Sequence, residues 1–590
     1  MMSSRSDGRS PKKAKLECEY KDLCYRQNPQ HFEEFSHAHL EELVSKMPEN
    51  GFRLPPDYNQ KISRRILELQ VNFIRNMKKS GSATTSKQRN SVSSDKNENN
   101  EVKQRNENVR TQPSTSASSS SPSTSKNKQQ ASSNRQQEEN YRRIVLDRVN
   151  TNIADKWKKA APYHVFLSAI SDSAPTHNDP LSIQFPELLD PRLGDLESSI
   201  QINFMVEAGW LLAQYCIMGH RDKPLTLLYE EGDHYIKDNV CPSYVKCVKV
   251  SCPSPFGKHH TKMMIMSYTD ESLRVIVTTG NLVESDWDNR VQGVWISPRC
   301  PRLPEKSDTA AGDSCTKFKT DLLDYLWSYR ESKLQEWIGK VSRTDFSSVK
   351  VFFVASTPGV HTGPDYVKWS QGKVSTILKN HTTINPTSDA HKWPIIAQSS
   401  SLGSFGPQPT DWLCGQITNS LSGGVNLGLL SKPSIKVIYP SFENVSQSYD
   451  SLLGGGCLPY MKKIHDKQPW LNKYLCQWKS DHQHRTRSMP HIKTYCRVSP
   501  CQKRIAWFYL TSANLSKAAW GNSKSPMKNY TMSYEAGIMF IPKFLVEEDY
   551  FPIKAGEGCD TKIPVFPMPY DLPLVPYKST DIPWFMDNLL

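Results

Sequence analysis

The 590-residue sequence contains no apolar run that approaches the ~18 residues a membrane-spanning helix requires. No secretory leader opens it either. Its 14 cysteines are scattered without the spacing of a disulfide framework, which suits a reducing compartment. These absences argue against a membrane protein and against a small disulfide-stapled domain. We therefore expect a soluble, intracellular protein that is long enough to bury a substantial core.

Residues 80–140 lack aromatic side chains and contain no Leu, Ile or Met. They consist mainly of Ser, Asn, Gln, Lys and Thr. Such a stretch cannot bury enough apolar surface to offset the entropy that is lost when a chain becomes ordered. We predict a disordered linker over residues 80–140.

Charge is nearly balanced over residues 161–590, whereas residues 1–160 hold 30 Lys and Arg against 19 Asp and Glu. A basic arm on a balanced body indicates either loose attraction to a polyanion or simple solubility, and composition alone leaves both open. Within the arm, residues 1–15 form a basic tail, and its cluster at residues 9–15 is of the nuclear-import type.

Residues 41–79 contain apolar side chains at helical spacing with basic side chains between them. This pattern predicts a basic amphipathic helix, which either packs locally or contacts nucleic acid. The apolar positions are Ile62, Ile66, Leu69, Phe73 and Met77.

Two stretches of the chain repeat the same set of reactive residue types. The first carries His260, Lys262, Asn281 and Trp287, and the second carries His491, Lys493, Asn514 and Trp520. A phosphodiester under attack needs a nucleophile, a proton donor for the leaving group and fixed positive charge around its oxygens. Two His, two Lys and two Asn supply that set without a metal ion.

The spacing within each stretch has a structural reason. Strands alternate faces with period two, so the two ends of His-x-Lys point the same way. The apolar residues 263–266 predict a strand that is buried on both faces. Residues 274–279 and 505–510 predict the next strand of each stretch, ending at a small-residue turn that presents Asn. The repeat predicts two similar α/β halves that face each other across one cleft.

This doubled pattern resembles the phospholipase D superfamily, and specifically its tyrosyl-DNA phosphodiesterase branch, over roughly residues 160–590. Most of the superfamily carries His-x-Lys-x4-Asp, but Ser267 and Val498 stand at the Asp positions, which is a mark of the branch. The strings HHTKMM at 259–264, MPHIKTY at 489–495 and TSANLSKAAWG at 511–521 match it as well. The resemblance implies two phospholipase D-like α-β-α sandwich halves, at residues 160–345 and 346–590.

The same resemblance implies a DNA repair enzyme that hydrolyses 3′-phosphotyrosyl and other 3′-blocking adducts, such as trapped topoisomerase I, and leaves a 3′-phosphate. His260 would be the nucleophile that forms a phosphohistidine, and His491 would be the general acid and base. The supporting residues would be Lys262, Lys493, Asn281 and Asn514 on the phosphoryl oxygens, Glu535 behind His260 and Gln292 behind His491. A neutral amide at Gln292 would avoid over-stabilising an imidazolium that must give up its proton.

The loop SSSLGS at residues 399–404 is able to offer hydroxyl and N–H groups to phosphates, although such a loop is often only a connection. The resemblance implies that Phe256 stacks on a base. Besides the two lysines, the implied DNA contacts are Ser400, Ser401, Ser404, Ser516 and Lys467. The implied partners are single-stranded or broken double-stranded DNA with 3′ adducts and a topoisomerase I-derived peptide. We expect a monomer in the nucleus, with the cytoplasm left open as a second location.

The segment Cys18-x5-Cys24-x6-His31-x5-His37 has the ligand types and spacing of one tetrahedral zinc site. A piece of about 25 residues has too little core to fold alone, so zinc would supply the folding free energy. His39 stays open as an alternative last ligand.

Residues 16–40 also resemble the poly(ADP-ribose)-binding zinc finger, through the string CYRQNPQH at 24–31. The resemblance implies that Tyr20, Tyr25 and Arg26 hold the adenine and phosphates of the polymer. Lys21 and Ala38 depart from the family, which usually has Gly and Pro there. The alternative is a zinc module that only contacts proteins.

Two other functions remain open for the whole chain. One is another phospholipase D-type enzyme, a nuclease or a lipase. The other is a non-catalytic adaptor that binds poly(ADP-ribose) and DNA ends. His259 beside His260 suggests a metal site at first sight, but no ligand cluster lies near it in the sequence, so we expect His259 to be structural.

Overall fold

The computed structural model describes residues 15–18, 21, 32, 35–48, 54–55, 67–68, 70–72, 74–75, 152–382, 384, 390–422, 432–525, 527–554 and 562–589. The chain divides into two compact units, Met1–Glu139 and Asn140–Leu590. The predicted linker over 80–140 and the apolar positions of the predicted basic helix lie outside the described residues.

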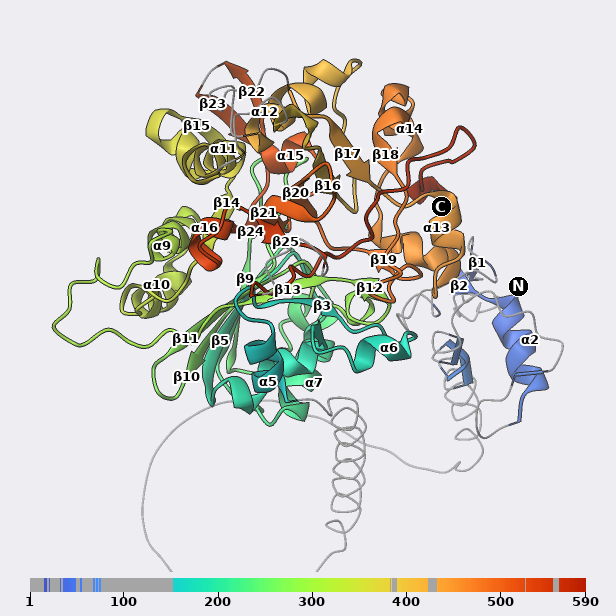
Figure 1. The fold of residues 1–590 in the computed structure, drawn as a ribbon. Coiled ribbons are helices and arrows are strands. Elements are labelled where there is room, and N and C mark those ends of the chain that lie inside the picture. The colour runs from blue at the N-terminus through green and yellow to red at the C-terminus, as the bar shows by residue number, and fades with distance from the viewer. Residues whose placement is uncertain are drawn as a thin grey trace, which may run out of the picture. The chain divides into compact units, whose positions relative to one another are not determined.

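The second unit contains two large sheets, one in each half of the repeat, and the first lies in the lower part of this unit in Figure 1. In this sheet β5, β7 and β9 run parallel, while β10 is antiparallel to both β5 and β11. In spatial order its strands are β4 (Ser182–Ile183), β3 (Val165–Ser168), β13 (Gly293–Ile296), β11 (Leu273–Thr278), β10 (Met263–Tyr268), β5 (Leu196–Ile202), β7 (Leu225–Tyr229) and β9 (Val245–Lys249).

The second sheet repeats seven of these places in the same spatial order. In that order its strands are β14 (Phe352–Ser356), β24 (Glu535–Phe540), β21 (Arg504–Thr511), β20 (Thr494–Val498), β16 (Ile395–Gln398), β17 (Ile435–Ile438) and β18 (Leu475–Cys476). A further strand, β25 (Phe551–Pro552), pairs with β21. Strands β16, β17 and β18 are parallel, and β20 is antiparallel to both β16 and β21. The two halves predicted from the repeated motifs are therefore topological copies.

Helices connect and flank the strands. In the first half they are α5 (Ile153–Lys159), α6 (Ala174–His177), α7 (Ala208–Ile217), α8 (His234–Lys237), α9 (Phe318–Ser328) and α10 (Gln335–Ser342). In the second half they are α11 (Ser370–His381), α12 (Thr418–Leu421), α13 (Phe442–Ser446), α14 (Lys462–His465), α15 (Lys517–Trp520) and α16 (Pro542–Leu545). Helices on both sides of the first sheet give it the expected α-β-α layering, as the packing of β10 shows.

Strand β10 is buried on both faces, as its four apolar residues predict. Met263 and Ile265 pack in the core that includes residues of α9 and α10. Met264 and Met266 pack in a separate core with residues of α5 and α7. Because successive side chains of a strand point to opposite faces, one short strand supports both layers.

The His-x-Lys segments differ slightly from the prediction. They form extended backbone directly before β10 and β20 rather than part of these strands. The ladder does reach the lysines, since Thr278 N–H donates to Lys262 O at 3.0 Å and Thr511 N–H to Lys493 O at 3.1 Å. The histidines leave the ladder because their backbone groups bond to the opposite half.

The halves meet through two short pairings. Strand β12 (Arg290–Val291) of the first half runs parallel to β19 (Met489–Pro490) of the second. On the other side, an isolated bridge joins His259 to Tyr534. Gly293 keeps the halves close, because a Cβ there would lie 2.7 Å from the side chain of Ile492. Smaller sheets lie elsewhere: β6 (Met205–Val206) with β8 (Glu231–Gly232), and β15 (Gly359–Thr362), β23 (Lys528–Thr531) and β22 (Asn522–Ser525).

In the first unit, β1 (Leu16–Glu17) pairs in parallel with β2 (Phe35–Ser36), and α2 (Ala38–Lys46) follows. Farther along, the described residues at 67–68, 70–71 and 74 are helical, and Leu67, Val71 and Ile74 among them are buried.

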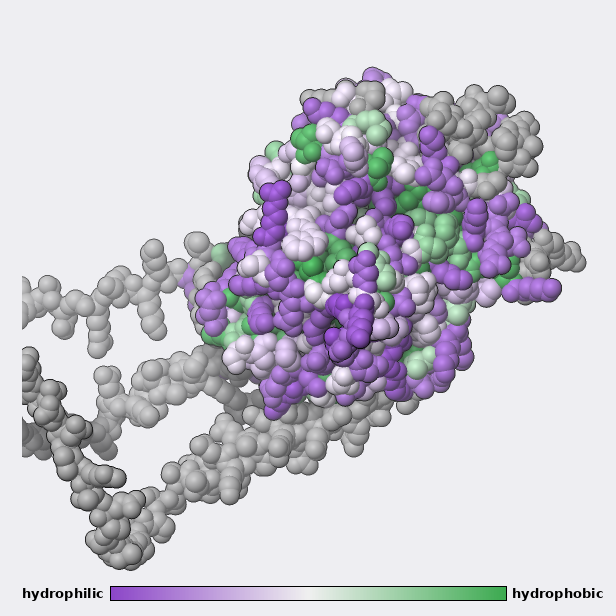
Figure 2. Space-filling model, turned by 90° about the vertical axis from the view of Figure 1, so that its left-hand side faces the viewer, coloured by the Kyte–Doolittle hydropathy of each residue, from purple (hydrophilic) through white to green (hydrophobic). Residues whose placement is uncertain are grey.

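The surface is mainly polar on the face drawn in Figure 2, with apolar side chains exposed in groups between the hydrophilic ones. Among the residues that the structure describes, no helix is long and apolar enough to cross a bilayer.

Candidate active site

Each histidine of the repeat is anchored by the opposite half. His491 follows β19 directly, and its N–H donates to Val291 O of β12 at 3.0 Å. The N–H of His260 donates to Tyr534 O at 2.9 Å. The two pairings between the halves thus hold the backbone of both histidines where the halves meet. Each histidine also precedes a strand of its own half.

The ring of His260 has a carboxylate behind it. Its Nδ1 lies 3.0 Å from Oε2 of Glu535, the residue after Tyr534. Ser512 Oγ donates to the same Oε2 at 2.5 Å and fixes the carboxylate. When Nδ1 carries the proton that Glu535 accepts, Nε2 is the nitrogen with a free lone pair.

The ring of His491 has two partners rather than one. Its Nδ1 lies 3.2 Å from Gln292 Oε1, and also 3.2 Å from Asp286 Oδ2. Asp286 closes the short 3-10 helix Glu284–Asp286 and is 1% exposed. Gln292 thus lies behind His491 as expected, and a buried carboxylate shares the same nitrogen.

The two asparagines are held in different ways. Asn514 Oδ1 accepts hydrogen bonds of 3.0–3.2 Å from Ser399 Oγ, from N–H and Oγ of Ser400, and from the N–H of Ser401. With its oxygen occupied, the NH₂ of Asn514 is the group left to donate into the site. Ser400 is 1% exposed, so it lies behind Asn514 and not on the surface.

Asn281 is held by Asp286 instead. Its backbone N–H and its Nδ2 donate to Asp286 Oδ2 at 2.7 and 2.9 Å. The tryptophans that follow the asparagines also differ. Trp287 Nε1 donates to Asn281 O at 2.8 Å, whereas Trp520 Nε1 donates to the hydroxyl of Tyr495 at 3.1 Å within the core.

The two lysines are fully buried, and burial makes their charge costly. Burial lowers the pKa of Lys262 to about 8, against the opposing charges of Glu535 and Asp286. Burial and the positive charge of Lys262 lower the pKa of Lys493 to about 7. Both ammonium groups therefore gain from an anion placed between them, which is what a phosphodiester supplies.

The histidines are also shifted toward their neutral forms. Burial and the charge of Lys493 lower the pKa of His491 to about 3, while Asp286 opposes this shift. Burial and Lys262 lower the pKa of His260, while Glu535 opposes. Each ring therefore depends on its carboxylate to hold a proton.

Comparison with known proteins identifies the family. The tyrosyl-DNA phosphodiesterase family model matches residues 164–578. Tyrosyl-DNA phosphodiesterase 1 of Drosophila melanogaster is 42% identical over 585 residues, which cover 97% of this chain and 99% of the relative. The chain belongs to the tyrosyl-DNA phosphodiesterase family. It is an enzyme, a phosphodiesterase of DNA repair.

Other matches extend this result. Tyrosyl-DNA phosphodiesterase 1 of Arabidopsis thaliana is 32% identical, over 67% of this chain and 70% of the relative. The crystal structure of yeast tyrosyl-DNA phosphodiesterase shares the fold, with a TM-score of 0.54 at 20% identity over 72% of this chain and 99% of that chain. The PBZ domain model matches residues 15–40, so this tyrosyl-DNA phosphodiesterase family member carries a domain of the zinc-finger type there.

The residues expected to contact DNA surround the serine loop. A Cβ at Gly403 would lie 2.9 Å from Ser516 Cβ, so this loop packs on the start of α15. Gln468, which follows the exposed Lys467, donates from Nε2 to Gly403 O at 2.9 Å. Ser404 is exposed, Ser401 and Ser516 are half-buried, and Phe256 is 77% exposed on a separate loop.

The sequence reasoning missed Phe204. Its ring centroid lies 5.7 Å from that of His260, and the ammonium groups of Lys258 and Lys262 lie 5.4 and 5.5 Å from the ring centre. Phe204 belongs to neither motif, and only its place after β5 brings it to the site. An aromatic residue at the end of a strand carries no distinguishing signal in one sequence.

The ring of His259 is buried against the rings of Tyr329 and Tyr534. Its Nε2 lies 2.8 Å from the hydroxyl of Tyr329, which in turn lies 2.7 Å from that of Tyr325 on α9. Tyr329 stacks on Tyr534 with ring centroids 4.7 Å apart. Burial lowers the pKa of His259 to about 3. The geometry is that of a structural histidine that backs the segment bearing His260.

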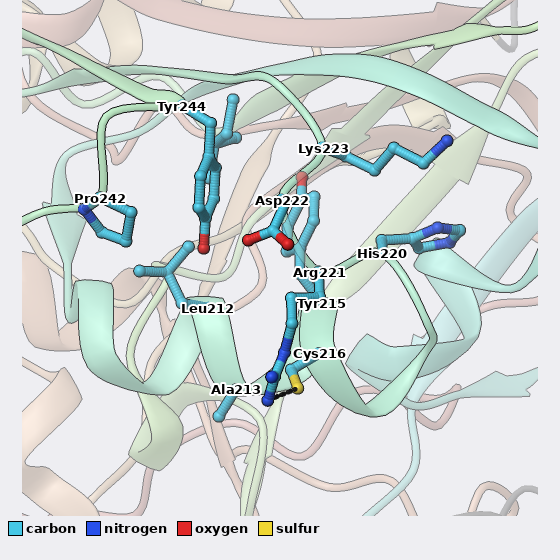
Figure 3. Close-up of a pocket in the computed structure, with 11 residues that line it drawn as sticks. Leu212, Ala213, Tyr215, Cys216, His220, Arg221, Asp222, Lys223, Pro242 and Tyr244 are labelled. Atoms are coloured by element: carbon cyan, nitrogen blue, oxygen red, sulfur yellow. Dashed lines mark hydrogen bonds between the residues drawn. The ribbon is translucent and has the colours of Figure 1, made fainter. Parts of the chain in front are cut away.

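A pocket of about 500 Å³ lies elsewhere in the first half and holds none of the motif residues. Figure 3 shows the apolar and polar side chains that line it, among them Arg221, whose Nη2 lies 3.4 Å from the Sγ of Cys216. The loops before β7 and β9 and one side of α7 form it.

In the finger segment, Cys18 and His37 directly follow the paired strands β1 and β2, and Cys18 N–H donates to Ser36 O at 3.0 Å. Both side chains are buried. A thiol and an imidazole brought together in this way fit two ligands of one zinc ion. The other residues expected at the finger, namely Tyr20, Cys24, Tyr25, Arg26 and His31, lie outside the described residues.

Proposed function

We propose that this enzyme hydrolyses 3′-phosphotyrosyl links and other 3′-blocking adducts of DNA, including those left by trapped topoisomerase I. The observation that carries the proposal is the crossed support of the two histidines. Each has its Nδ1 against a group of the opposite half, and two buried lysines lie beside them. The family supplies the substrate class and the order of the two histidines.

In the first step Nε2 of His260 attacks the phosphorus in line. The bond from phosphorus to the tyrosine oxygen breaks, and His491 gives its Nε2 proton to that oxygen. The products are a free tyrosine hydroxyl and DNA joined through its 3′-phosphate to His260.

In the second step the neutral His491 takes a proton from water. The water oxygen attacks the phosphorus, the bond to His260 breaks, and DNA leaves with a 3′-phosphate. His491 is then protonated again, which restores the starting state.

The remaining side chains stabilise the transition states without a metal ion. Lys262 and Lys493 hold the non-bridging oxygens, and Asn514 donates from its NH₂. Asn281 adds its second amide hydrogen, while Glu535 and Gln292 orient the rings. Ser400 orients Asn514, in addition to the direct DNA contact expected of it.

The exposed residues around the cleft bind the DNA strand. Ser401, Ser404, Ser516 and Lys467 would hold phosphates, and Phe256 would stack on a base. Single strands and frayed duplex ends both fit such contacts. One chain supplies every catalytic group, so we propose a monomeric enzyme.

The finger over residues 16–40 would bind one structural zinc through Cys18, Cys24, His31 and His37 and read poly(ADP-ribose) through Tyr20, Tyr25 and Arg26. It would bring the enzyme to marked DNA breaks in the nucleus, with the basic tail at 1–15 as the import signal. Residues 41–79 and 80–140 would connect it to the two catalytic halves at 160–345 and 346–590.

The chemistry is tested with an oligonucleotide that carries a 3′-phosphotyrosine. Wild-type protein should release tyrosine and leave a 3′-phosphate, and His260→Ala should be nearly inert. His491 serves both steps, so a His491→Asn variant that slows the second step more than the first should accumulate a covalent protein–DNA adduct on a denaturing gel. Wild-type activity that disappears in excess chelator would overturn the metal-free mechanism.

The same preparation separates the alternatives. Turnover of phosphatidylcholine with no turnover of the oligonucleotide would favour a lipase of the superfamily. Binding of DNA ends without any cleavage would favour the adaptor.

A further inference from the structure

Asp286 lies at the centre of a buried set of hydrogen bonds in the active site. Its Oδ2 accepts from Asn281 N–H at 2.7 Å and Asn281 Nδ2 at 2.9 Å and lies 3.2 Å from His491 Nδ1. Its Oδ1 accepts from Arg290 Nη1 at 2.6 Å. The carboxylate is thus tied to His491, to a phosphate-binding amide and to the strand that joins the halves.

The charges around His491 make this carboxylate necessary. Lys493 and Lys262 both disfavour a proton on the ring, and Arg290 lies just beyond Asp286. Cys457 and Asp450 also lie near Arg290, and burial keeps the Cys457 thiol neutral by raising its pKa to about 11. Gln292 accepts a hydrogen bond but brings no charge. Within the described part of the chain, Asp286 is the carboxylate that contacts His491.

We infer that Asp286 is a positioning residue that holds His491 with Nδ1 protonated and keeps it able to carry a second proton on Nε2 for the leaving tyrosine. This inference rests on the proposed function. During the first step the Nε2 proton moves to the tyrosine oxygen, while the Nδ1 proton and the negative charge of Asp286 stay where they are. The same carboxylate also accepts two hydrogen bonds from Asn281, and it thereby orients one of the side chains that bind the phosphate.

The matching position of the second half carries no carboxylate. Asp286 lies five residues after Asn281, and the residue five after Asn514 is Ala519, which belongs to the core. Behind His260 the carboxylate is Glu535, at the place that Gln292 occupies behind His491. The two histidines are thus supported by differently placed charges, as two different roles require.

The experiment compares two leaving groups with Asp286→Asn. One oligonucleotide carries 3′-phosphotyrosine, whose oxygen must be protonated as it leaves. The other carries a 3′-(4-nitrophenyl) phosphate ester, whose phenolate leaves without a proton. In single-turnover assays at pH 7.5, we expect the variant to lose about 10- to 100-fold on phosphotyrosine and no more than a few-fold on the nitrophenyl ester.

The matched control is Asp288→Asn, which removes a nearby carboxylate that accepts a hydrogen bond from Ser171 Oγ at 2.6 Å. It should cleave both substrates at the wild-type rate. An equal loss by Asp286→Asn on both substrates would assign Asp286 a purely structural role and overturn the inference. Wild-type protein inactive on both substrates would instead refute the proposed function.

A second measurement reads the proton of His491 in the wild-type protein. In wild-type protein labelled with ¹⁵N-histidine, the neutral ring of His491 should carry its proton on Nδ1, with the signal assigned by its loss in His491→Asn. A neutral ring protonated on Nε2 would overturn the inference, because Nδ1 would then have no proton for a hydrogen bond to Asp286.

Discussion

At the scale of single residues, the two lysines carry the positive charge that a phosphodiester requires, yet their burial makes both easier to deprotonate. The pKa of Lys493 is lowered to about 7 and that of Lys262 to about 8. At a pH below both values the two lysines of the free enzyme are charged. As the pH rises, Lys493 loses its proton first and Lys262 loses its proton next. A bound phosphate opposes the loss, because a nearby anion raises the pKa of an ammonium group.

This predicts different pH profiles for two kinetic constants. For a 3′-phosphotyrosyl oligonucleotide, kcat/KM should fall as the pH rises through about 7 to 8, because it reports groups of the free enzyme. The value of kcat should fall less over the same range. Steady-state rates at closely spaced pH values test this, with circular dichroism at each pH to show that the fold is kept. A kcat/KM that stays constant up to pH 9 would contradict the prediction.

At the scale of elements, the serine loop at 399–404 has an inner and an outer side. Ser400 lies behind Asn514 and donates to its Oδ1 at 3.1 Å, whereas Ser404 is exposed near Ser516. In the proposed function, one loop therefore both orients a catalytic amide and contacts the DNA strand. Since the two serines differ by position and not by chemistry, they form a matched pair for mutation.

We predict that Ser400→Ala lowers kcat about five-fold, the equivalent of losing one hydrogen bond of about 1 kcal/mol. Ser404→Ala should leave kcat unchanged and raise KM about two-fold, since it removes one exposed phosphate contact. Steady-state kinetics on one oligonucleotide measure both. If both variants lowered kcat by the same factor, the inner and outer serines would have the same role, which would contradict this prediction.

The elements also show what one sequence can predict. Strands β10 and β21 were predictable because their apolar runs are long and dense, and the motifs beside them repeat. The pairing of β12 with β19 was not, because two residues on each side make no pattern. That pairing places Asp286 and Gln292 beside His491, about 200 residues away in sequence. Gln292 was found through its family motif, whereas Asp286 in a loop had no signal of its own.

At the scale of the whole molecule, the chain combines a small zinc-finger-type domain with a two-half catalytic unit that contains the complete site. The finger depends on a metal for its folding free energy in the proposal, and the catalytic steps do not. The two units should therefore respond separately to a mutation in either one.

We predict that Cys24→Ala abolishes binding of poly(ADP-ribose) and leaves hydrolysis of naked DNA almost unchanged. Tyr25→Ala is the matched control, because it should weaken polymer binding while keeping the zinc ion. Filter binding with labelled polymer and a metal assay of purified protein measure the two effects. Polymer binding that survives Cys24→Ala would assign it to the basic arm instead.

The repeated strand order has a last consequence, for the polarity of the substrate. A site with two equivalent histidines would accept a phosphodiester in either sense, and the bond to the 3′ oxygen of the DNA would break as often as the bond to the adduct. In the second half the position that matches Asp286 is Ala519, which has no carboxylate. The two sides of the site are therefore not interchangeable. Together with Glu535 and Gln292, which also differ at matching places, this difference gives the two histidines separate roles, so the leaving group that receives a proton lies on the side of His491.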